Sequence, residues 1–165
     1  SIMKKLAVGM AVFAGVAVLM IAASAFATPN LDFSTVQLSK GRFGEIDVKT
    51  NDALPHQVKL KTQGESDVYV VENTVKPGGH SGWHTHPGPS LITIKSGTAT
   101  FYDSDDPTCT PHVYPAGTGV IDPGDGHIHL LRNEGNVDLV TVTVQILPAD
   151  APRRIDAPSP GNCPF

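Results

Sequence analysis

The stretch 78–97, GGHSGWHTHPGPSLITIKSG, decides the fold of this chain. It places His84 and His86 two residues apart, and His127 and His129 repeat that spacing about 43 residues later. Residues i and i+2 of a β-strand point to the same face of a sheet, so each pair presents two imidazoles side by side. Two neighbouring strands that carry such pairs into one barrel would bring three histidines together around a single metal ion.

A site built only from imidazoles suits Zn²⁺, Cu²⁺, Fe²⁺ or Ni²⁺ better than Mg²⁺ or Ca²⁺. A histidine taken alone is more often a loop or core residue with no ligand role. Two such pairs within one small β-domain favour a metal site instead.

The residues around this stretch alternate in hydropathy as β-strands do. Val, Ile and Thr dominate the runs, for example at 68–70, 99–101 and 140–146, and Gly and Pro separate them, for example at 77–79 and 122–126. The chain holds 16 Gly and 14 Pro, and no helical pattern of apolar residues follows residue 27. Strands spaced about ten residues apart predict an all-β antiparallel sandwich or barrel of one domain.

The first 27 residues have the pattern of a secretory signal peptide. Lys4 and Lys5 precede the apolar stretch 6–23, and the small residues Ala25 and Ala27 follow it at the −3 and −1 positions. The alternative is an uncleaved membrane anchor, because the apolar stretch is nearly long enough to span a bilayer. We expect cleavage after Ala27 and a mature protein that is secreted or periplasmic.

The charge of the chain excludes one class of partner. The formal net charge is −4, and it becomes −6 once Lys4 and Lys5 are set aside. So acidic a chain is not expected to bind nucleic acid. No apolar run after residue 27 could span a bilayer, so no membrane contact is expected after cleavage.

Two cysteines, Cys109 and Cys163, are the only ones in the sequence. In an oxidising compartment two cysteines more often pair than stay free. A Cys109–Cys163 bridge would hold the proline-rich tail, residues 148–165, against the domain. The alternative is two free surface thiols.

Both histidine pairs lie in segments that resemble the two motifs of the cupins. Gly78, His84, His86, Ser90 and Gly97 follow the order and spacing of the first motif, and the second motif is matched by Gly117, Pro123, Gly126, His129 and Asn133. The resemblance implies a small, exported, single-domain bacterial cupin, with a double-stranded β-helix or jelly-roll barrel over residues 28–147. It also implies that His84, His86 and His129 bind a metal ion inside the barrel mouth, and that a homodimer is one expected assembly.

The sequence departs from the cupin pattern at two places. Ser90 occupies the position where the first motif normally has a glutamate, and one extra residue lies between Pro123 and Gly126. Without the glutamate, the site resembles the neutral three-histidine sites of thiol and diketone dioxygenases and favours an anionic small-molecule ligand. The opposing interpretation is a weakened, vestigial metal site.

Two further histidines are candidates for a catalytic role. His127 has the same strand parity as His129 and could be a fourth ligand, a general base or a hydrogen-bonding partner of a ligand. His80 has the parity of His84 and could line the barrel mouth. Trp83 has the opposite parity and is expected on the outer face, and His112 is expected to face solvent.

Three functions agree with such a site. The first is a dioxygenase-type oxidoreductase acting on a small metal-chelating substrate, with one divalent transition metal, Fe, Cu, Mn, Ni or Zn, of which Zn would exclude redox chemistry. The second is a non-catalytic module that binds a small molecule or the metal itself. The third, a metal-dependent isomerase or lyase, needs a positioned base, for which His127 or His80 would serve.

Overall fold

The computed structural model describes residues 26–51, 53 and 55–165. The predicted signal peptide, residues 1–27, therefore lies outside the described residues except for Phe26 and Ala27. Ala27 pairs with Pro158 in an isolated antiparallel bridge. No helix in the described residues is long and apolar enough to cross a membrane.

The described chain contains twelve strands and no α-helix. The strands are β1 (Leu31–Phe43), β2 (Asp47–Lys49), β3 (Lys59–Lys61), β4 (Ser66–His80), β5 (His84–Thr85), β6 (Ser90–Ser96), β7 (Thr98–Asp103), β8 (His112–Pro115), β9 (Gly119–Asp122), β10 (His129–Arg132), β11 (Leu139–Pro148) and β12 (Ile155–Asp156). All strand pairs are antiparallel. The prediction of an all-β jelly-roll barrel is confirmed.

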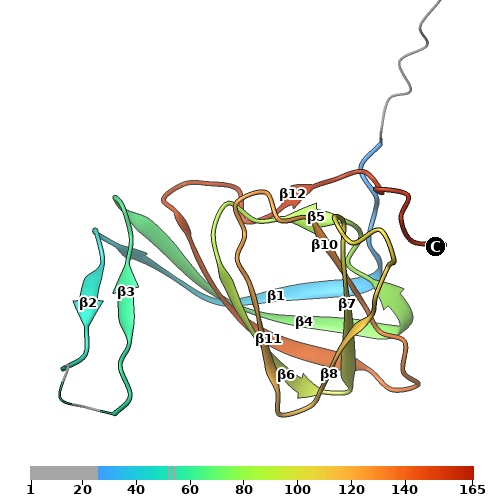
Figure 1. Ribbon diagram of the computed structural model, residues 1–165, viewed down its shortest axis with the longest axis horizontal. Coiled ribbons are helices and arrows are strands. Elements are labelled where there is room, and N and C mark those ends of the chain that lie inside the picture. Colours follow the sequence, from blue (N-terminus) through green and yellow to red (C-terminus); the bar gives the residue numbers. More distant parts are fainter. Residues whose placement is uncertain (1–25, 52, 54) are drawn as a thin grey trace, which may run out of the picture.

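Ten strands form one sheet that curls into the barrel (Figure 1). Its main path runs β12-β5-β10-β4-β11-β6-β9, while β1 pairs with β4, and β7 pairs with β10 and β8. The short strands β5 and β10 each begin with one histidine, His84 and His129, and these two residues are partners in the ladder. His86 directly follows β5, and His127 lies two residues before β10. This pairing positions the site.

Strand β1 is a long element that the apolar alternation of the sequence did not predict. It runs for 13 residues along β4, yet most of its side chains are exposed. Neither face of β1 is fully buried, so no alternation of apolar and polar residues marks it.

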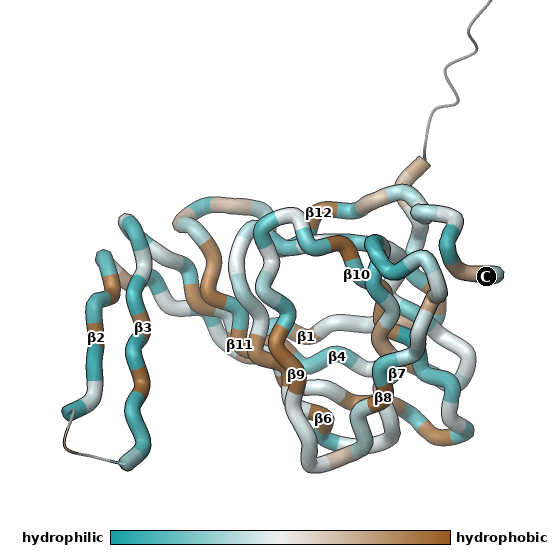
Figure 2. The backbone as a smooth tube through the Cα atoms, in the orientation of Figure 1, coloured by the Kyte–Doolittle hydropathy of each residue, from teal (hydrophilic) through white to brown (hydrophobic). Residues whose placement is uncertain are grey.

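The inner face of β11 is more polar than the apolar alternation of residues 140–146 suggests. Thr141, Thr143 and Gln145 are buried inside the barrel, whereas Val142 and Val144 are half-buried on the other face. Figure 2 shows apolar residues on the barrel wall alternating with hydrophilic ones. The barrel interior is therefore built partly to hold a polar cavity.

The apolar core is divided around that cavity. One cluster holds Val75, Ile94, Phe101, Leu131 and Leu139 with their neighbours. A second, separate cluster packs Trp83, Tyr102, Leu130, Ala157 and Cys163. Trp83 is directed away from the histidine cavity, as its parity predicts, but it is 1% exposed because the C-terminal segment covers it.

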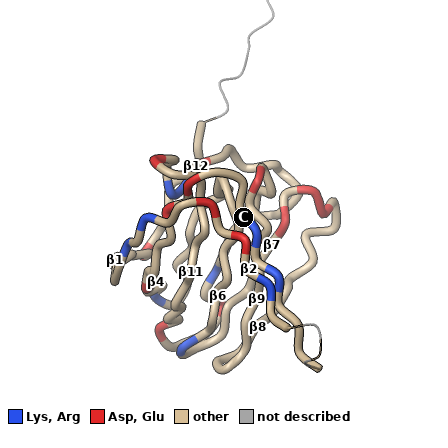
Figure 3. The backbone as a smooth tube through the Cα atoms, turned by 90° about the vertical axis from the view of Figure 1, so that its left-hand side faces the viewer, with Lys and Arg blue, Asp and Glu red and all other residues tan. Residues whose placement is uncertain are grey.

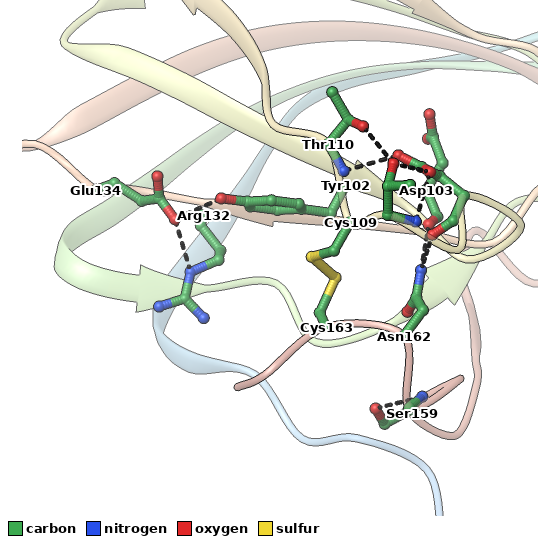
Figure 4. The surroundings of a disulfide bond; sticks show 12 residues. Tyr102, Asp103, Cys109, Thr110, Arg132, Glu134, Ser159, Asn162 and Cys163 are labelled. Atoms are coloured by element: carbon green, nitrogen blue, oxygen red, sulfur yellow. Dashed lines mark hydrogen bonds and ion pairs between the residues drawn. A yellow bond between two sulfur atoms is a disulfide. The ribbon is translucent and has the colours of Figure 1, made fainter.

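The C-terminal segment 149–165 crosses the barrel opening (Figure 1). Strand β12 pairs with β5, the backbone N–H of Ala157 donates to the carbonyl of Trp83, and the Asn162 amide donates to the carbonyls of Asp103 and Asp106. The predicted Cys109–Cys163 disulfide is present and anchors the end of the segment (Figure 4). Most of the segment is irregular, yet it is an integral layer of the barrel.

A small hairpin of β2 and β3 forms its own two-stranded sheet and extends away from the barrel (Figure 1). Basic and acidic residues lie interspersed along the backbone rather than segregated by sign (Figure 3). The hairpin lies apart from the barrel opening where the histidines meet.

Candidate metal centre

Strands β5 and β10 bring His84, His86 and His129 together inside the barrel. The ring centroids of His84 and His86 lie 4.9 Å apart, those of His84 and His129 4.4 Å, and those of His86 and His129 5.6 Å. One nitrogen of each ring lies within 4.8 Å of a nitrogen of both others. All three side chains are buried. This arrangement matches the three-ligand set that the cupin resemblance implies.

Each of these rings has its Nδ1 atom facing a hydrogen-bond acceptor. Nδ1 of His84 lies 2.9 Å from the carbonyl oxygen of Gly82, and Nδ1 of His86 lies 2.7 Å from that of Arg153. Nδ1 of His129 lies 3.5 Å from Oδ1 of Asp122. The carbonyl oxygens beside His84 and His86 only accept, so the proton of these two rings belongs on Nδ1, and their Nε2 lone pairs are free for a metal ion. Nδ1 of His129 forms no hydrogen bond with the described residues.

The turn that precedes His84 depends on a glycine. Gly82 has a φ of +71°, and a Cβ atom built there would lie 2.3 Å from the carbonyl oxygen of Thr28. A larger residue would displace the backbone of residue 82, and with it the carbonyl group that orients the His84 ring.

Burial keeps the three imidazoles neutral. Desolvation is the largest cause that lowers the pKa of His84, of His86 and of His129, the last to about 4. A metal ion binds only the deprotonated ring, so ligands that are neutral at pH 7 are ready to bind one. Three neutral nitrogen donors fit a divalent transition metal.

The three histidines open into a small cavity of about 60 Å³. Its polar lining includes Ser90, Thr143, Gln145 and Arg153, and none of the described residues lining it is an aspartate or glutamate. Ser90 is fully buried, and its hydroxyl accepts a hydrogen bond from the Gln145 amide at 3.2 Å. No carboxylate among the described lining residues takes the place of the missing glutamate, so the three-histidine donor set is neutral.

The extra residue between Pro123 and Gly126 is absorbed in a tight turn. Gly124, Asp125 and Gly126 all have positive φ values. A Cβ at Gly124 would lie 2.2 Å from the carbonyl oxygen of Gly88, so the turn packs directly against the loop after His86. The insertion therefore leaves His129 in register.

The C-terminal segment supplies two arginines that the sequence pattern did not single out. Arg153 and Arg154 both line the cavity. Nη1 of Arg153 donates to Oε1 of Gln145 at 3.0 Å, and Nη2 of Arg154 donates to the carbonyl of Ser81 at 2.7 Å. They lie in the tail, far from either motif, and only the pairing of β12 with β5 brings them to the site.

His127 lies on the far side of His129. Its Nδ1 is 3.1 Å from Oδ1 of Asp122 and its Nε2 is 3.3 Å from Oδ1 of Asp103. It lines a second cavity of about 260 Å³, which His112 and His129 also line, and not the three-histidine cavity. The His112 side chain is 45% exposed, and its Nε2 lies 3.5 Å from Oδ2 of Asp103, which also lines this second cavity.

The other catalytic candidate, His80, lies outside the lining of both cavities. Its Nδ1 accepts a hydrogen bond from the backbone N–H of Gly82 at 3.1 Å. His80 thus contacts the turn that precedes His84 rather than the cavity.

Asp122 is a site residue that sequence reasoning missed. Its side chain is 4% exposed, Oδ1 faces both His127 and His129, and Oδ2 has no hydrogen-bond partner in the described chain. The sequence feature that could have indicated its role is its position directly before Pro123, within the second cupin-like motif.

Comparison with known proteins identifies this architecture. A family model described as "Cupin domain" matches residues 71–145, which include all three histidines. No curated protein matches the chain. Among solved structures, a protein with a double-stranded β-helix domain from Klebsiella pneumoniae is 23% identical, with 70% of this chain and 80% of that chain covered and a TM-score of 0.47.

Two other structures are similar at the same level. A cupin domain from Bordetella pertussis is 22% identical, with 62% of this chain and 93% of that chain covered and a TM-score of 0.42. A protein of unknown function from Streptococcus pyogenes is 21% identical, with 49% of this chain covered and a TM-score of 0.42. This chain spans 65% of that streptococcal protein, slightly less than two thirds.

Proposed function

This chain belongs to the cupin superfamily, and on that premise we propose that it is an exported, metal-dependent oxidoreductase of the dioxygenase type. The substrate is a small molecule that chelates the metal. One observation carries the proposal: three buried histidines lie close enough to share one metal ion, in a cavity whose described lining residues include no aspartate or glutamate.

Three protein ligands leave coordination positions open for a substrate. A bound redox-active metal supplies electron transfer between a chelated substrate and O₂. The chain's own residues hold the substrate in place: Phe101 and Ile92 line the cavity with apolar surface, and Thr143 offers a hydroxyl group to the heteroatoms of the substrate. The small volume restricts the site to a compact ligand.

A non-catalytic binding module is the second candidate. Neither His127 nor His80 lines the three-histidine cavity, and the three ligands are the histidines that do. The cavity therefore holds no further imidazole that could act as a base, which favours binding without catalysis. An isomerase or lyase would need a base in contact with the substrate, so the same positions weigh against that third function.

Metal analysis of protein isolated after export tests the proposal. Protein of this kind is expected to hold about one equivalent of Fe, Cu, Mn or Ni, and the His84→Ala/His129→Ala variant is expected to hold none. His56→Ala, which changes an exposed histidine outside the site, is the matched control and should keep the metal. Zinc, or no metal, would overturn the oxidoreductase.

Oxygen uptake separates the first two candidates. The loaded protein should consume O₂ with diketones, thiols or phenols, and the double variant should not. A stoichiometric redox metal with no oxygen uptake from any of these substrates would favour the binding module.

The location outside the cytoplasm rests on the disulfide, which is typical of oxidising compartments. Export through a cleaved leader is proposed from residues 1–27. N-terminal sequencing of the protein recovered from the periplasm or medium should begin at Thr28, and an N-terminus upstream of Lys4 would indicate a retained anchor.

A further inference from the structure

The C-terminal segment places an unpaired cation at the metal cavity. Arg153 lines the cavity and forms no ion pair with any described residue, in contrast to Arg154, whose Nε lies 2.5 Å from Oδ1 of Asp156. Among the described residues, the guanidinium of Arg153 has one side-chain hydrogen bond, to the neutral amide of Gln145. Burial lowers the pKa of Arg153, but a guanidinium remains charged at neutral pH.

The hydrogen bonds around Arg153 tie it to the metal ligands. Its carbonyl oxygen accepts from Nδ1 of His86, and its guanidinium donates to Gln145, whose amide nitrogen lies 3.1 Å from the same ring and 3.2 Å from the Ser90 hydroxyl. The guanidinium is therefore linked through Gln145 to Ser90, the position where the cupin glutamate is missing.

No carboxylate among the described lining residues balances the charge of Arg153. Its described lining has two arginines and three neutral histidines, and Asp156 neutralises only one of the arginines. A divalent ion on the histidines would add two more positive charges. Half-buried cations without counter-charges are costly, so a ligand that supplies negative charge is favoured.

We propose that Arg153 binds the anionic group of the ligand, and that the ligand of this site is a small carboxylate. The inference rests on the proposed metal site. The fork of the guanidinium matches a carboxylate, because two parallel N–H groups can donate to its two oxygens. Nη1 of Arg153 donates to Gln145, and the N–H groups on Nε and Nη2 are the donors available to the ligand.

The cavity limits the size of that carboxylate. One water needs about 10–15 Å³ of such space, so about 60 Å³ holds roughly four or five water-sized groups. A carboxylate of about four to six non-hydrogen atoms is the size that fits.

The disulfide helps to fix the C-terminal segment that carries Arg153. Cys163 and Asn162 fix the end of the segment to the loop that carries Cys109, and β12 fixes its start to β5. Arg153 lies between the end of β11 at Pro148 and the start of β12 at Ile155, so a paired strand holds the chain on each side of it.

Calorimetric titration with acetate and with acetamide tests the proposal, because the two probes have the same size and differ in charge. The titrations use the full mature chain, both metal-free and loaded with Co²⁺. Acetate is expected to bind the Co²⁺ form and acetamide to bind at least about tenfold more weakly. Arg153→Gln should lower the affinity for acetate by about tenfold or more, while its affinity for Co²⁺ should stay within about threefold of the wild-type value.

Lys95→Gln is the matched control, since it removes one positive charge from an exposed side chain that pairs with Glu72 on the outer surface. It should leave acetate affinity unchanged. Equal acetate affinity in Arg153→Gln and the wild type would overturn the proposal, as would equal binding of acetate and acetamide.

A measurement on the wild type covers the case in which Arg153→Gln does not fold. The NMR resonance of the Arg153 Nε–H should shift as acetate is added to the diamagnetic Zn²⁺-loaded protein or the metal-free protein. A resonance that does not move at saturating acetate would also overturn the proposal.

The two proposals fail in different ways. If no Co²⁺ binds, the metal site is wrong, and acetate binding to the metal-free chain that is lost in Arg153→Gln would still support Arg153 as the anion-binding group. If Co²⁺ binds but Arg153→Gln does not change the affinity for acetate, the metal site is supported and the assignment of a carboxylate ligand to Arg153 is wrong.

Discussion

The carbonyl oxygen of Arg153 accepts a hydrogen bond from Nδ1 of His86 at 2.7 Å. The two residues are 67 positions apart in the sequence. A predicted metal ligand is thus oriented by the segment that sequence analysis treated as a tail beyond the domain. The site is completed only when the C-terminal segment lies across the barrel.

Asp122→Asn should weaken metal binding by about 10–100-fold. The carboxylate of Asp122 faces Nδ1 of His129, and an acidic acceptor there raises the basicity of the ring and orients it. Equilibrium dialysis or a competition titration with a coloured chelator measures the change. Asp103→Asn is the control, because the Asp103 carboxylate lies against the rings of His127 and His112, and Asp103 meets His129 only as its backbone partner in the ladder of β7 and β10. Equal losses in both variants would contradict a specific role for Asp122.

Acid should destabilise the metal-free protein at a pH set by the histidines. Burial lowers the pKa of His84, His86 and His129 below the 6.5 of the unfolded chain. The unfolded state therefore binds more protons, and the stability that the neutral rings contribute is present above pH 6.5 and is lost as the pH falls toward about 4.

Thermal melts of the metal-free protein from pH 8 to pH 4 would reveal this loss as a falling Tm. A His84→Ala/His129→Ala variant should show a shallower fall over the same range, because two of the titrating rings are gone. An identical pH dependence in the variant and the wild type would show that other groups govern acid stability.

Ser90→Glu should restore a carboxylate to the metal site. Ser90 is fully buried in the cavity lining, so a glutamate there adds a ligand and a negative charge. We expect tighter metal binding by about tenfold, weaker acetate binding and a loss of about 1–3 kcal/mol in stability from the larger side chain.

Ser90→Gln has the size of glutamate without its charge and serves as the control for that variant. It should lose similar stability without the gain in metal affinity. If both variants bind metal equally, the missing carboxylate is not what sets the affinity of this site.

Cys163→Ser should lower the free energy of unfolding by about 2–4 kcal/mol, because the bridge closes a long loop in the unfolded chain. Urea denaturation measures the change. Ser159→Ala, in the same segment, alters only a local hydrogen bond to Gly161 and should cost under about 0.5 kcal/mol. Acetate affinity should fall along with stability in Cys163→Ser, since the bridge helps to hold the segment that carries Arg153.

Much of the site could be predicted from local spacing. The i, i+2 histidine pairs and the turn residues around them are short-range features, and strand geometry alone converts His84 and His86 into neighbours on one face. Val and Thr alternation likewise predicted β11 and β4, whose mutual register the structure shows directly. Strand β1 escaped prediction because exposure on both faces leaves no periodic signal.

The contributions of Asp122 and of Arg153 could not be predicted in the same way. Asp122 acts through a contact with His129 that depends on the turn at Gly124–Gly126, and Arg153 acts through a strand pairing of only two residues between β12 and β5. Neither contact has a sequence period or a fixed spacing.

Strand periodicity and turn residues in the amino-acid sequence predicted an all-β antiparallel sandwich or barrel, and the resemblance to the cupins implied the jelly roll and the three histidine ligands. The presence of two cysteines favoured a bridge over two free thiols, and the structure contains that bridge. The tertiary structure alone decided that His127 belongs to a different cavity from the three ligands, that no carboxylate replaces the one absent at Ser90, and that Arg153 enters the cavity. Those features depend on which distant segments the closed barrel brings within hydrogen-bond distance, and chain order does not encode such distances in any short pattern.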